Sequence, residues 1–392
     1  MESTTKRSWM IVWLVALGLT VLSLVTHITS PSSIRLSEQD WQDRVAFHNS
    51  EPAFVARPFT NGIVAFAHDR LGLSVKTSFF GLQFLLMFIS IPAFYHYLSR
   101  LGFDFGACIK GVFIYGLSLP VFLAHFDPVF TWSDFWVYAA VPLAFSFTLD
   151  GRSFLATLAM AVALLARETT LIFLPVWFLF VYRRDDRSLR KAILMSGAVV
   201  LVFVIYRYFN GVGNFAQPQY NLDFNFAYAM RTSDTIFSLL VSLGFLWVVG
   251  MWQASQKQEN PFRYYNLIRF GAVFTVVGFV SSTLVMTFAR ESRIFFPPFV
   301  FLIPLALIWL DSHKESLRKL WDSVRPVPPA LVLIVLIGIS IGLSMLLFPD
   351  YEFRHWKDGN RTWLGLHIAV VLVFLAVQWR SRRTDYRSEN DS

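Results

Sequence analysis

Long apolar stretches recur along the whole chain, and they limit what it can fold into more than any other feature. A helix needs roughly 17 to 25 mostly apolar residues to cross the hydrocarbon core of a bilayer. Twelve stretches approach that length, at 8–27, 79–97, 107–124, 134–149, 153–167, 170–183, 191–208, 236–253, 269–288, 294–311, 329–348 and 362–379. The pattern predicts an all-α polytopic membrane protein with about 12 transmembrane helices, within roughly 10 to 13 because some stretches are short.

The composition agrees with a membrane protein and argues against a soluble one. Hydrophobic residues make up 55% of the chain and charged residues only 15%. A soluble domain has roughly a quarter of its residues charged. In a soluble protein, a net charge of +8 would suggest nucleic acid as a binding partner. In a membrane protein the same excess belongs to loops on one side, so we expect membrane lipids as partners and no nucleic acid.

Basic residues gather in alternate loops between the apolar stretches. They cluster around residues 183–191, 257–269 and 314–325 and in the tail after residue 380. Because Lys and Arg collect on the cytoplasmic side, this pattern predicts that both termini are cytoplasmic. The chain then forms a single transmembrane domain over 1–392, with a first extracytoplasmic loop at 28–78 and a disordered cytoplasmic tail at 380–392. The short basic loops suggest the inner (plasma) membrane of a bacterium.

The first extracytoplasmic loop carries acids soon after the first apolar stretch. Asp40 and Asp43 stand there, and the apolar spacing from Val45 onward predicts short amphipathic helices on the membrane surface. A carboxylate at the lipid–water boundary is placed to act as a base on a lipid-linked substrate. The alternative is that both aspartates are ordinary charges of a solvated loop.

A second outer junction reads HFDPVFTWSDFW and contains Asp127, Trp132 and Asp134. Asp127 suits an active-site acid, or a helix cap because Pro128 follows it. The ring of Trp132 suits stacking on a sugar, or anchoring at the membrane interface.

Two further junctions place arginine and glutamate at helix ends. Arg167 and Glu168 stand between two apolar runs with almost no loop, and Arg290, Glu291 and Arg293 precede the run IFFPPF. Ionisable groups this close to hydrocarbon are costly and therefore indicate function, and an arginine matches the oxygens of a phosphate. The alternatives are an Arg–Glu ion pair that closes a tight turn at the first junction and side chains that snorkel to the interface at the second.

On the predicted topology all four groups lie on the same face of the membrane. Acids from the first loop and arginines from two later helix ends are what transfer from a phosphate-linked donor requires. A carboxylate would take the proton of an acceptor hydroxyl, and the cations would hold the leaving phosphate.

The chain resembles the GT-C superfamily of membrane glycosyltransferases. The resemblance rests on Asp40 and Asp43 after the first apolar stretch, the pair Arg57–Pro58 in the same loop, and the ends Arg167–Glu168 and Glu291–Arg293. It implies a polyprenyl-phosphate sugar as donor, with Asp40 or Asp43 as the base. It also implies that Arg57, Arg167, Glu168, Glu291 and Arg293 bind substrate. The junctions themselves add Asp127, Trp132 and Arg290 as candidate substrate-binding residues.

The chain departs from this family in two respects. Many relatives carry adjacent acids in the first loop, whereas here Glu38, Asp40 and Asp43 are spaced. Relatives that modify peptides carry a large soluble C-terminal domain, and its absence here favours a glycan or lipid acceptor. Relatives differ in their need for a divalent metal such as Mg²⁺ or Mn²⁺, and the motifs leave metal dependence open.

Two other functions fit parts of the sequence. A polysaccharide polymerase or ligase that uses lipid-diphosphate glycans would share the arginines, but the large late outer loop typical of that class is short here, at 349–361. A transporter or flippase for a lipid-linked substrate would place its charges near the bilayer midplane. In this sequence the charges stand mainly at helix ends.

Overall fold

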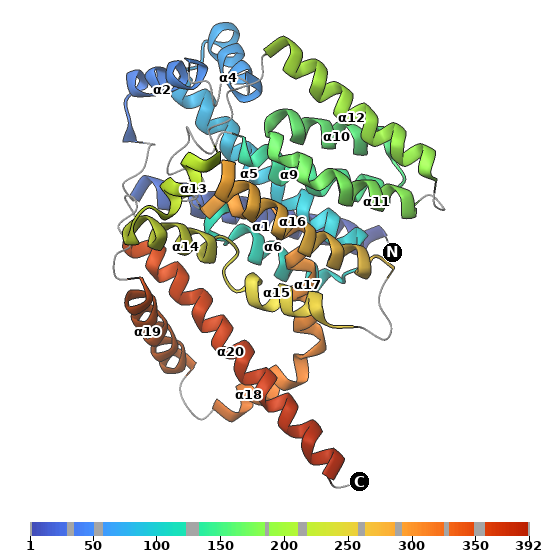
Figure 1. The fold of residues 1–392 in the computed structure, drawn as a ribbon, viewed down its shortest axis with the longest axis vertical. Helices are drawn as coiled ribbons and strands as arrows, with labels where there is room; N and C mark the ends of the chain where they lie inside the picture. The colour runs from blue at the N-terminus through green and yellow to red at the C-terminus, as the bar shows by residue number, and fades with distance from the viewer. Residues whose placement is uncertain are drawn as a thin grey trace.

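The protein is built from helices. The computed structural model describes residues 2–29, 35–50, 58–122, 133–184, 188–210, 218–257, 263–286, 292–324, 329–348 and 357–390. Within these ranges the chain forms helices joined by short turns, and no residue lies in a strand, as Figure 1 shows. The all-α class predicted from the sequence is confirmed for these ranges.

The helices follow one another with short connections. The first half of the chain contains α1 (Glu2–Thr29), α2 (Glu38–Ser50), α4 (Pro58–Leu71), α5 (Val75–Arg100), α6 (Phe105–Gly116), α7 (Leu119–Phe122), α9 (Asp134–Leu149), α10 (Ser153–Ala166), η3 (Glu168–Phe173) and α11 (Leu174–Arg184). The second half contains α12 (Leu189–Asn210), α13 (Pro218–Phe226), α14 (Ala229–Leu243), α15 (Leu246–Ser255), α16 (Tyr265–Met286), η4 (Ser292–Phe295), α17 (Phe299–Ser312), α18 (Lys314–Val324), α19 (Pro329–Leu347) and α20 (Lys357–Asn390).

Several helices are suited to a membrane. Five in the described ranges are long and apolar enough to cross one, at Arg7–Thr29, Val75–Arg100, Leu189–Phe209, Tyr265–Val285 and Thr362–Trp379. The pair α14 and α15 would make a sixth if it counts as one span. Five shorter apolar helices, among them α6, α9, α10 and α17, complete the bundle. The membrane class agrees with the sequence. Within the described residues fewer helices reach full length than the predicted 12, and turns or bends divide the stretches 107–124, 170–183, 236–253 and 294–311.

The core of the bundle surrounds α17. Eleven of its residues, from Phe299 to Trp309, are buried. A helix that is apolar on every side is stable only in the interior, so α17 takes that place, with α6, α15 and α16 packed around it. Aromatic rings fill the space between the helices. Phe299 stacks on Phe296 and on Tyr115, with ring centroids 4.8 and 5.0 Å apart.

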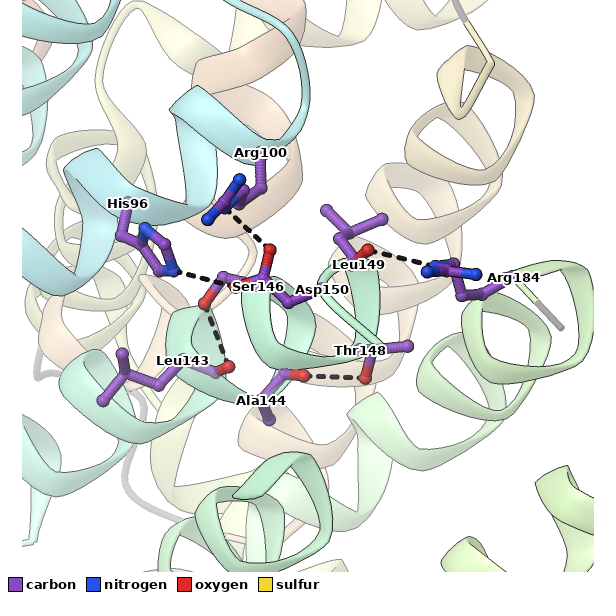
Figure 2. A network of polar contacts seen from close by, with 9 residues as sticks. All are labelled: His96, Arg100, Leu143, Ala144, Ser146, Thr148, Leu149, Asp150 and Arg184. Atoms are coloured by element: carbon purple, nitrogen blue, oxygen red, sulfur yellow. Dashed lines mark hydrogen bonds and ion pairs between the residues drawn. The ribbon is translucent and has the colours of Figure 1, made fainter. Parts of the chain in front are cut away.

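The two ends of the bundle are defined by α9. Figure 2 shows one end, where Asp150 follows α9 and pairs with Arg100 at the end of α5, Nε to Oδ1 2.8 Å. His96 lies 3.4 Å from the same carboxylate, and Arg184 at the end of α11 donates to the Leu149 carbonyl at 3.0 Å. We call this the Asp150 end. The opposite end, where α9 begins, is called the Asp134 end.

The segment predicted as the first outer loop contains the expected helices, α2 and α4. Trp41 of α2 is fully buried and stacks on Phe79 of α5, with ring centroids 4.9 Å apart. Glu38 accepts hydrogen bonds from the backbone N–H groups of Val75 and Lys76 at 2.7 and 3.1 Å. A carboxylate at this position satisfies donors that the first turn of a helix leaves unpaired. The segment is therefore fastened to the start of α5.

A sharp bend separates α14 from α15. The two helices meet at 65°, and Gly244 between them has φ of +52°. This conformation suits glycine because it has no Cβ. The ring of His367 from α20 lies directly against the bend, since a Cβ built on Gly244 would be 2.2 Å from its Nδ1. The bend and α20 therefore fit together without room for any side chain at residue 244.

The C-terminal segment differs from its prediction. The sequence predicted a disordered tail from residue 380, whereas α20 continues as a helix to Asn390 (Figure 1). Extending an existing helix fixes one residue for each new hydrogen bond, which is far easier than nucleating one. The long apolar part of α20 provides that start.

Candidate functional site

An ion pair between Asp134 and Arg167 is the most deeply buried charged contact among the described residues. Asp134 is the first residue of α9 and is 0% exposed, and the side chain of Arg167 is 8% exposed. Arg167 follows α10 in an extended conformation, and its N–H donates to the Ala163 carbonyl at 3.0 Å. This corner turns the arginine side chain back towards α9. Burial without a partner would be very unfavourable for either charge, so each one stabilises the other.

The next residue along the chain makes a second ion pair. Glu168 begins η3, and its Oε2 lies 3.2 Å from Nη2 of Arg207 in the last turn of α12. The two side chains are 16% and 12% exposed. Arg167 and Glu168 thus pair with α9 on one side and α12 on the other. The sequence had offered an ion pair between these two neighbours, and the structure gives each of them a partner on another helix.

A third polar group lies where α14 meets η4. Asp234 and Thr235 of α14 are both 1% exposed, and α14 packs against η4. Thr235 donates to the Asn225 carbonyl at 3.1 Å, and the Asn225 amide donates to the Leu284 carbonyl at 3.1 Å. These contacts join α14 to α13 and α13 to α16. Asp234 is thus a buried acid on a helix that packs against η4, the turn that contains Arg293.

These groups gather at the Asp134 end. Both η3 and η4 pack against α16, and η4 also packs against α7 and α14. The chain runs from the Asp150 end to the Asp134 end along α10 and α12, so Glu168 after α10 and Arg207 near the end of α12 come together. The sequence had placed Arg167, Glu168 and Arg293 on one face, and the turns η3 and η4, which contain Glu168 and Arg293, each pack against α16.

The first-loop acids have structural partners. The carboxylate Oδ2 of Asp40 accepts from the Ser37 backbone N–H at 2.9 Å and from its hydroxyl at 2.6 Å, while the Asp40 N–H donates to the Ser37 hydroxyl at 3.1 Å. This reciprocal arrangement is a capping box, with aspartate in the place of the usual glutamate or glutamine. Asp43 accepts from the Gln39 amide at 2.9 Å. Both aspartates are exposed.

The hydrogen bonds alter the acidity of the first-loop acids. Donation from the side chain and backbone of Ser37 holds the pKa of Asp40 below its usual value. Burial raises the pKa of Glu38, but the N–H groups of Lys76 and Val75 outweigh that effect, and its pKa is lowered overall. A carboxylate with a lowered pKa is a weaker base, so these bonds favour the capping role for both residues.

The first-loop segment lies farther along the bundle axis than the buried ion pairs, beyond Asp134. α5 and α9 both end at the Asp150 network, and they pack against each other. α5 has 26 residues and α9 has 16. At 1.5 Å per residue, α5 therefore begins roughly 15 Å beyond Asp134 along the bundle. Glu38 is fastened to that far end of α5.

Some predicted site residues lie outside the described residues. These are Arg57, Asp127, Trp132, Arg290 and Glu291. The backbone of Arg293 lies in η4, but its side chain is not among those described. Among the predicted substrate-binding residues, the structure therefore describes the side chains of Arg167 and Glu168.

Sequence reasoning did not assign three of the charged residues at this end. Asp134 was recognised as part of its junction but not as a site residue, and Arg207 and Asp234 were not singled out. The sequence signals each of them only weakly, by the position of a charged residue in the first or last turns of an apolar helix. Only the fold shows which of these charges face one another.

An apolar groove runs along the outside of the bundle next to the Arg167–Glu168 corner. It has a volume of about 550 Å³ and lies between η3 and α11 on one side and α16 on the other. Its lining is Leu171, Ile172, Pro175, Phe270, Val273, Phe274, Val277 and Gly278. A Cβ built on Gly278 would lie 2.7 Å from Cγ2 of Ile172, so glycine is what lets η3 approach α16. The groove begins at Leu171 of η3, the helix whose first residue is Glu168.

The described residues do not assemble an evident metal site. Within those ranges no group of three or more His, Cys, Asp or Glu side chains is placed to hold a metal ion. Comparison with protein-family models, curated proteins and solved structures finds no match for this chain.

Proposed function

We propose that the protein is a GT-C type glycosyltransferase that moves a sugar from a polyprenyl-phosphate donor to a glycan or lipid acceptor. The observation that carries this proposal is the Arg167–Glu168 corner, where two mostly buried ion pairs lie next to an apolar groove. A lipid-phosphate donor has the same two parts, a charged head and a long apolar chain. The groove suits the chain, and the arginines of the corner suit the phosphate.

The reaction would be a direct displacement. The acceptor hydroxyl oxygen forms a bond to the anomeric carbon of the donor sugar, and the bond from that carbon to the phosphate oxygen breaks. The phosphate leaves with the electron pair as an anion, which the nearby cations stabilise. A carboxylate takes the hydroxyl proton. Asp40 and Asp43 were predicted for this role, and the capping bonds of Asp40 make the buried Asp234 a further candidate.

The membrane topology is part of the same proposal. All twelve apolar stretches would contribute to about 12 membrane passages, with the Asp134 end on the extracytoplasmic face and both termini in the cytoplasm. In support, Arg100 and Arg184 lie at the Asp150 end (Figure 2), and Arg152 precedes α10 in the turn after Asp150, as on a cytoplasmic face. The proposed location is a bacterial inner membrane.

The test measures transfer of radiolabelled sugar in membranes from a set of synthetic polyprenyl-phosphate donors. Glu168→Gln and Asp134→Asn change the proposed site, and Asp150→Asn is the matched control. Asp134 and Asp150 flank the same helix and each pairs with an arginine, but only Asp134 belongs to the proposed site. We expect transfer by wild type and by Asp150→Asn, and strongly reduced transfer by the two site variants at equal amounts of folded protein.

Two results would contradict the proposal. The first is that no donor in the set is consumed by wild-type membranes. The second is that the folded Glu168→Gln and Asp134→Asn variants transfer sugar as fast as Asp150→Asn does. Parallel assays of Asp40→Asn, Asp43→Asn and Asp234→Asn identify the base among these acids.

Transport of a lipid-linked substrate is a second candidate, and the bend between α14 and α15 favours it. Interrupted helices with a polar side chain at the break are a feature of many transporters, and His367 lies at this break. The two functions separate in one experiment with reconstituted vesicles. A transporter moves a labelled lipid-linked sugar across the bilayer without consuming it, whereas a transferase releases the polyprenyl phosphate.

A further inference from the structure

The amphipathic helix α18 lies where the apolar part of the bundle ends. It connects the buried α17 to the apolar α19 and packs against α20 (Figure 1). His313, the residue before α18, lies 3.1 Å from the amide nitrogen of Gln378, ring Nε2 to Nε2. The apolar span of α20 ends at Trp379, the next residue. The start of α18 is therefore level with the edge of the hydrocarbon.

Trp321 lies between an apolar flank and a basic flank of α18. Leu317 and Leu320 on the apolar flank pack on the core of the bundle, while the ring of Trp321 is 53% exposed. Lys314 and Arg318 precede Trp321 by seven and three residues, so both stand on the same side of the helix as the indole. This exposed side, formed by Lys314, Arg318 and Trp321, is called the α18 basic face.

Another cation of α18 points elsewhere. Lys319 lies 3.8 Å from Glu315, four residues earlier, and the two form an exposed pair. At 100° per residue, Lys319 stands nearly opposite Trp321 around the helix. The helix therefore has one cation paired with an acid away from Trp321, and two cations beside it.

We propose that the α18 basic face binds the headgroups of anionic phospholipids in the leaflet at the Asp150 end. Tryptophan is the side chain that prefers the boundary between headgroups and hydrocarbon, and cations beside it contact phosphate. The continuation of α20 beyond the span adds Arg380, Arg382, Arg383 and Arg387 to the sequence at the same edge. This inference rests on the membrane class alone and does not depend on the proposed transferase activity.

The test uses quenching of tryptophan fluorescence by lipids with brominated acyl chains. The protein is reconstituted in vesicles of phosphatidylcholine with increasing fractions of brominated phosphatidylglycerol or brominated phosphatidylcholine. The chain has 13 tryptophans, so the signal of Trp321 is taken as the difference between wild type and Trp321→Phe. We expect this difference signal to be quenched by phosphatidylglycerol at a lower mole fraction than by phosphatidylcholine.

Charge variants supply the matched comparison. Each cation near an anionic surface contributes about 1 kcal/mol, so Arg318→Gln should lower the preference for phosphatidylglycerol roughly fivefold. Lys319→Gln removes the same charge from the next residue and should leave the preference nearly unchanged. Asp322→Asn removes an acid four residues after Arg318 and should raise the preference.

Two outcomes would overturn the inference. One is that neither brominated lipid quenches the Trp321 signal, which would place α18 away from the bilayer. The other is that Arg318→Gln and Lys319→Gln change the lipid preference equally, which would mean a diffuse charge effect without a basic face.

Discussion

Asp134 and Arg167 close the open end of a helical hairpin. α9 and α10 are joined by a tight turn at Gly151, and the ion pair links the first residue of α9 to the residue that follows α10. The carboxylate is completely buried and the guanidinium nearly so. One contact thus fixes both the separation of the two helices and the direction in which the chain enters η3.

Removing one member of this pair should destabilise the protein strongly. Asp134→Asn or Arg167→Gln leaves a buried charge without its partner, which costs about 3–5 kcal/mol. The double variant Asp134→Leu/Arg167→Met removes both charges and should recover most of the loss. Thermal unfolding in detergent measures all three. If the double variant loses as much stability as the two single variants lose together, the two residues act independently.

The pair Glu168–Arg207 should matter for both stability and activity. The two side chains are only 16% and 12% exposed, so removing one of them leaves the other charge largely buried, which costs up to about 3–5 kcal/mol. If the corner holds the donor phosphate, Arg207→Gln should reduce the rate of sugar transfer, roughly in the range of 10- to 1000-fold for a lost electrostatic contact. Initial rates at several donor concentrations check this. Unchanged rates from a folded Arg207→Gln protein would place the phosphate elsewhere.

The groove beside η3 depends on Gly278. Gly278→Ala introduces a Cβ that collides with Ile172, so η3 should move away from α16. We expect a lower melting temperature and weaker use of long-chain donors. Adding Ile172→Ala removes the atom in the way and should restore both properties. Gly197→Ala on α12 is the control, because no atom lies within 4 Å of its added Cβ. A defect of equal size in that control would rule out the steric explanation.

The attachment of the first loop to α5 should weaken in acid. Glu38 has a folded-state pKa below its usual value, so its stabilising effect is complete above roughly pH 4.3, the pKa of an unperturbed glutamate. The effect is lost as the pH falls through the lower folded-state pKa, where the carboxylate takes up a proton. Glu38→Gln should be less stable than wild type at pH 6, and the difference should shrink on acidification.

Melting temperatures of both proteins between pH 6 and pH 3 measure this difference. Asp43→Asn serves as the control, because Asp43 is bonded within α2 and not to another helix. A gap between wild type and Glu38→Gln that is constant with pH would show that the Glu38 carboxylate is not what attaches α2 to α5.

The positions of the helices could be predicted from the sequence because hydropathy is a local property. Every one of the twelve apolar stretches falls on one or more of the observed helices. Their lengths were harder to predict. The stretch 236–253 reads as one apolar run, but the conformation of Gly244 divides it into α14 and α15. The stretch 170–183 begins with the turn η3.

The partners of the charged residues could not be predicted, because pairing depends on how distant helices pack. The sequence indicated that Arg167 and Glu168 were unusual so close to hydrocarbon. Nothing local could show that their partners would be Asp134 and Arg207. Asp40 shows the opposite case, since its bonds to Ser37 are local. From the sequence, Asp40 was considered as a base or a solvated charge, and its S-x-x-D spacing was not identified as a capping signal.

The contact between Gly244 and His367 has a consequence for the order of assembly. During synthesis α14 and α15 are made well before α20. Until that last helix arrives, the backbone at Gly244 lacks the His367 ring that packs against it. The bend between α14 and α15 therefore reaches its final packing only after translation of the C-terminal helix, and a chain that stops before α20 cannot complete it.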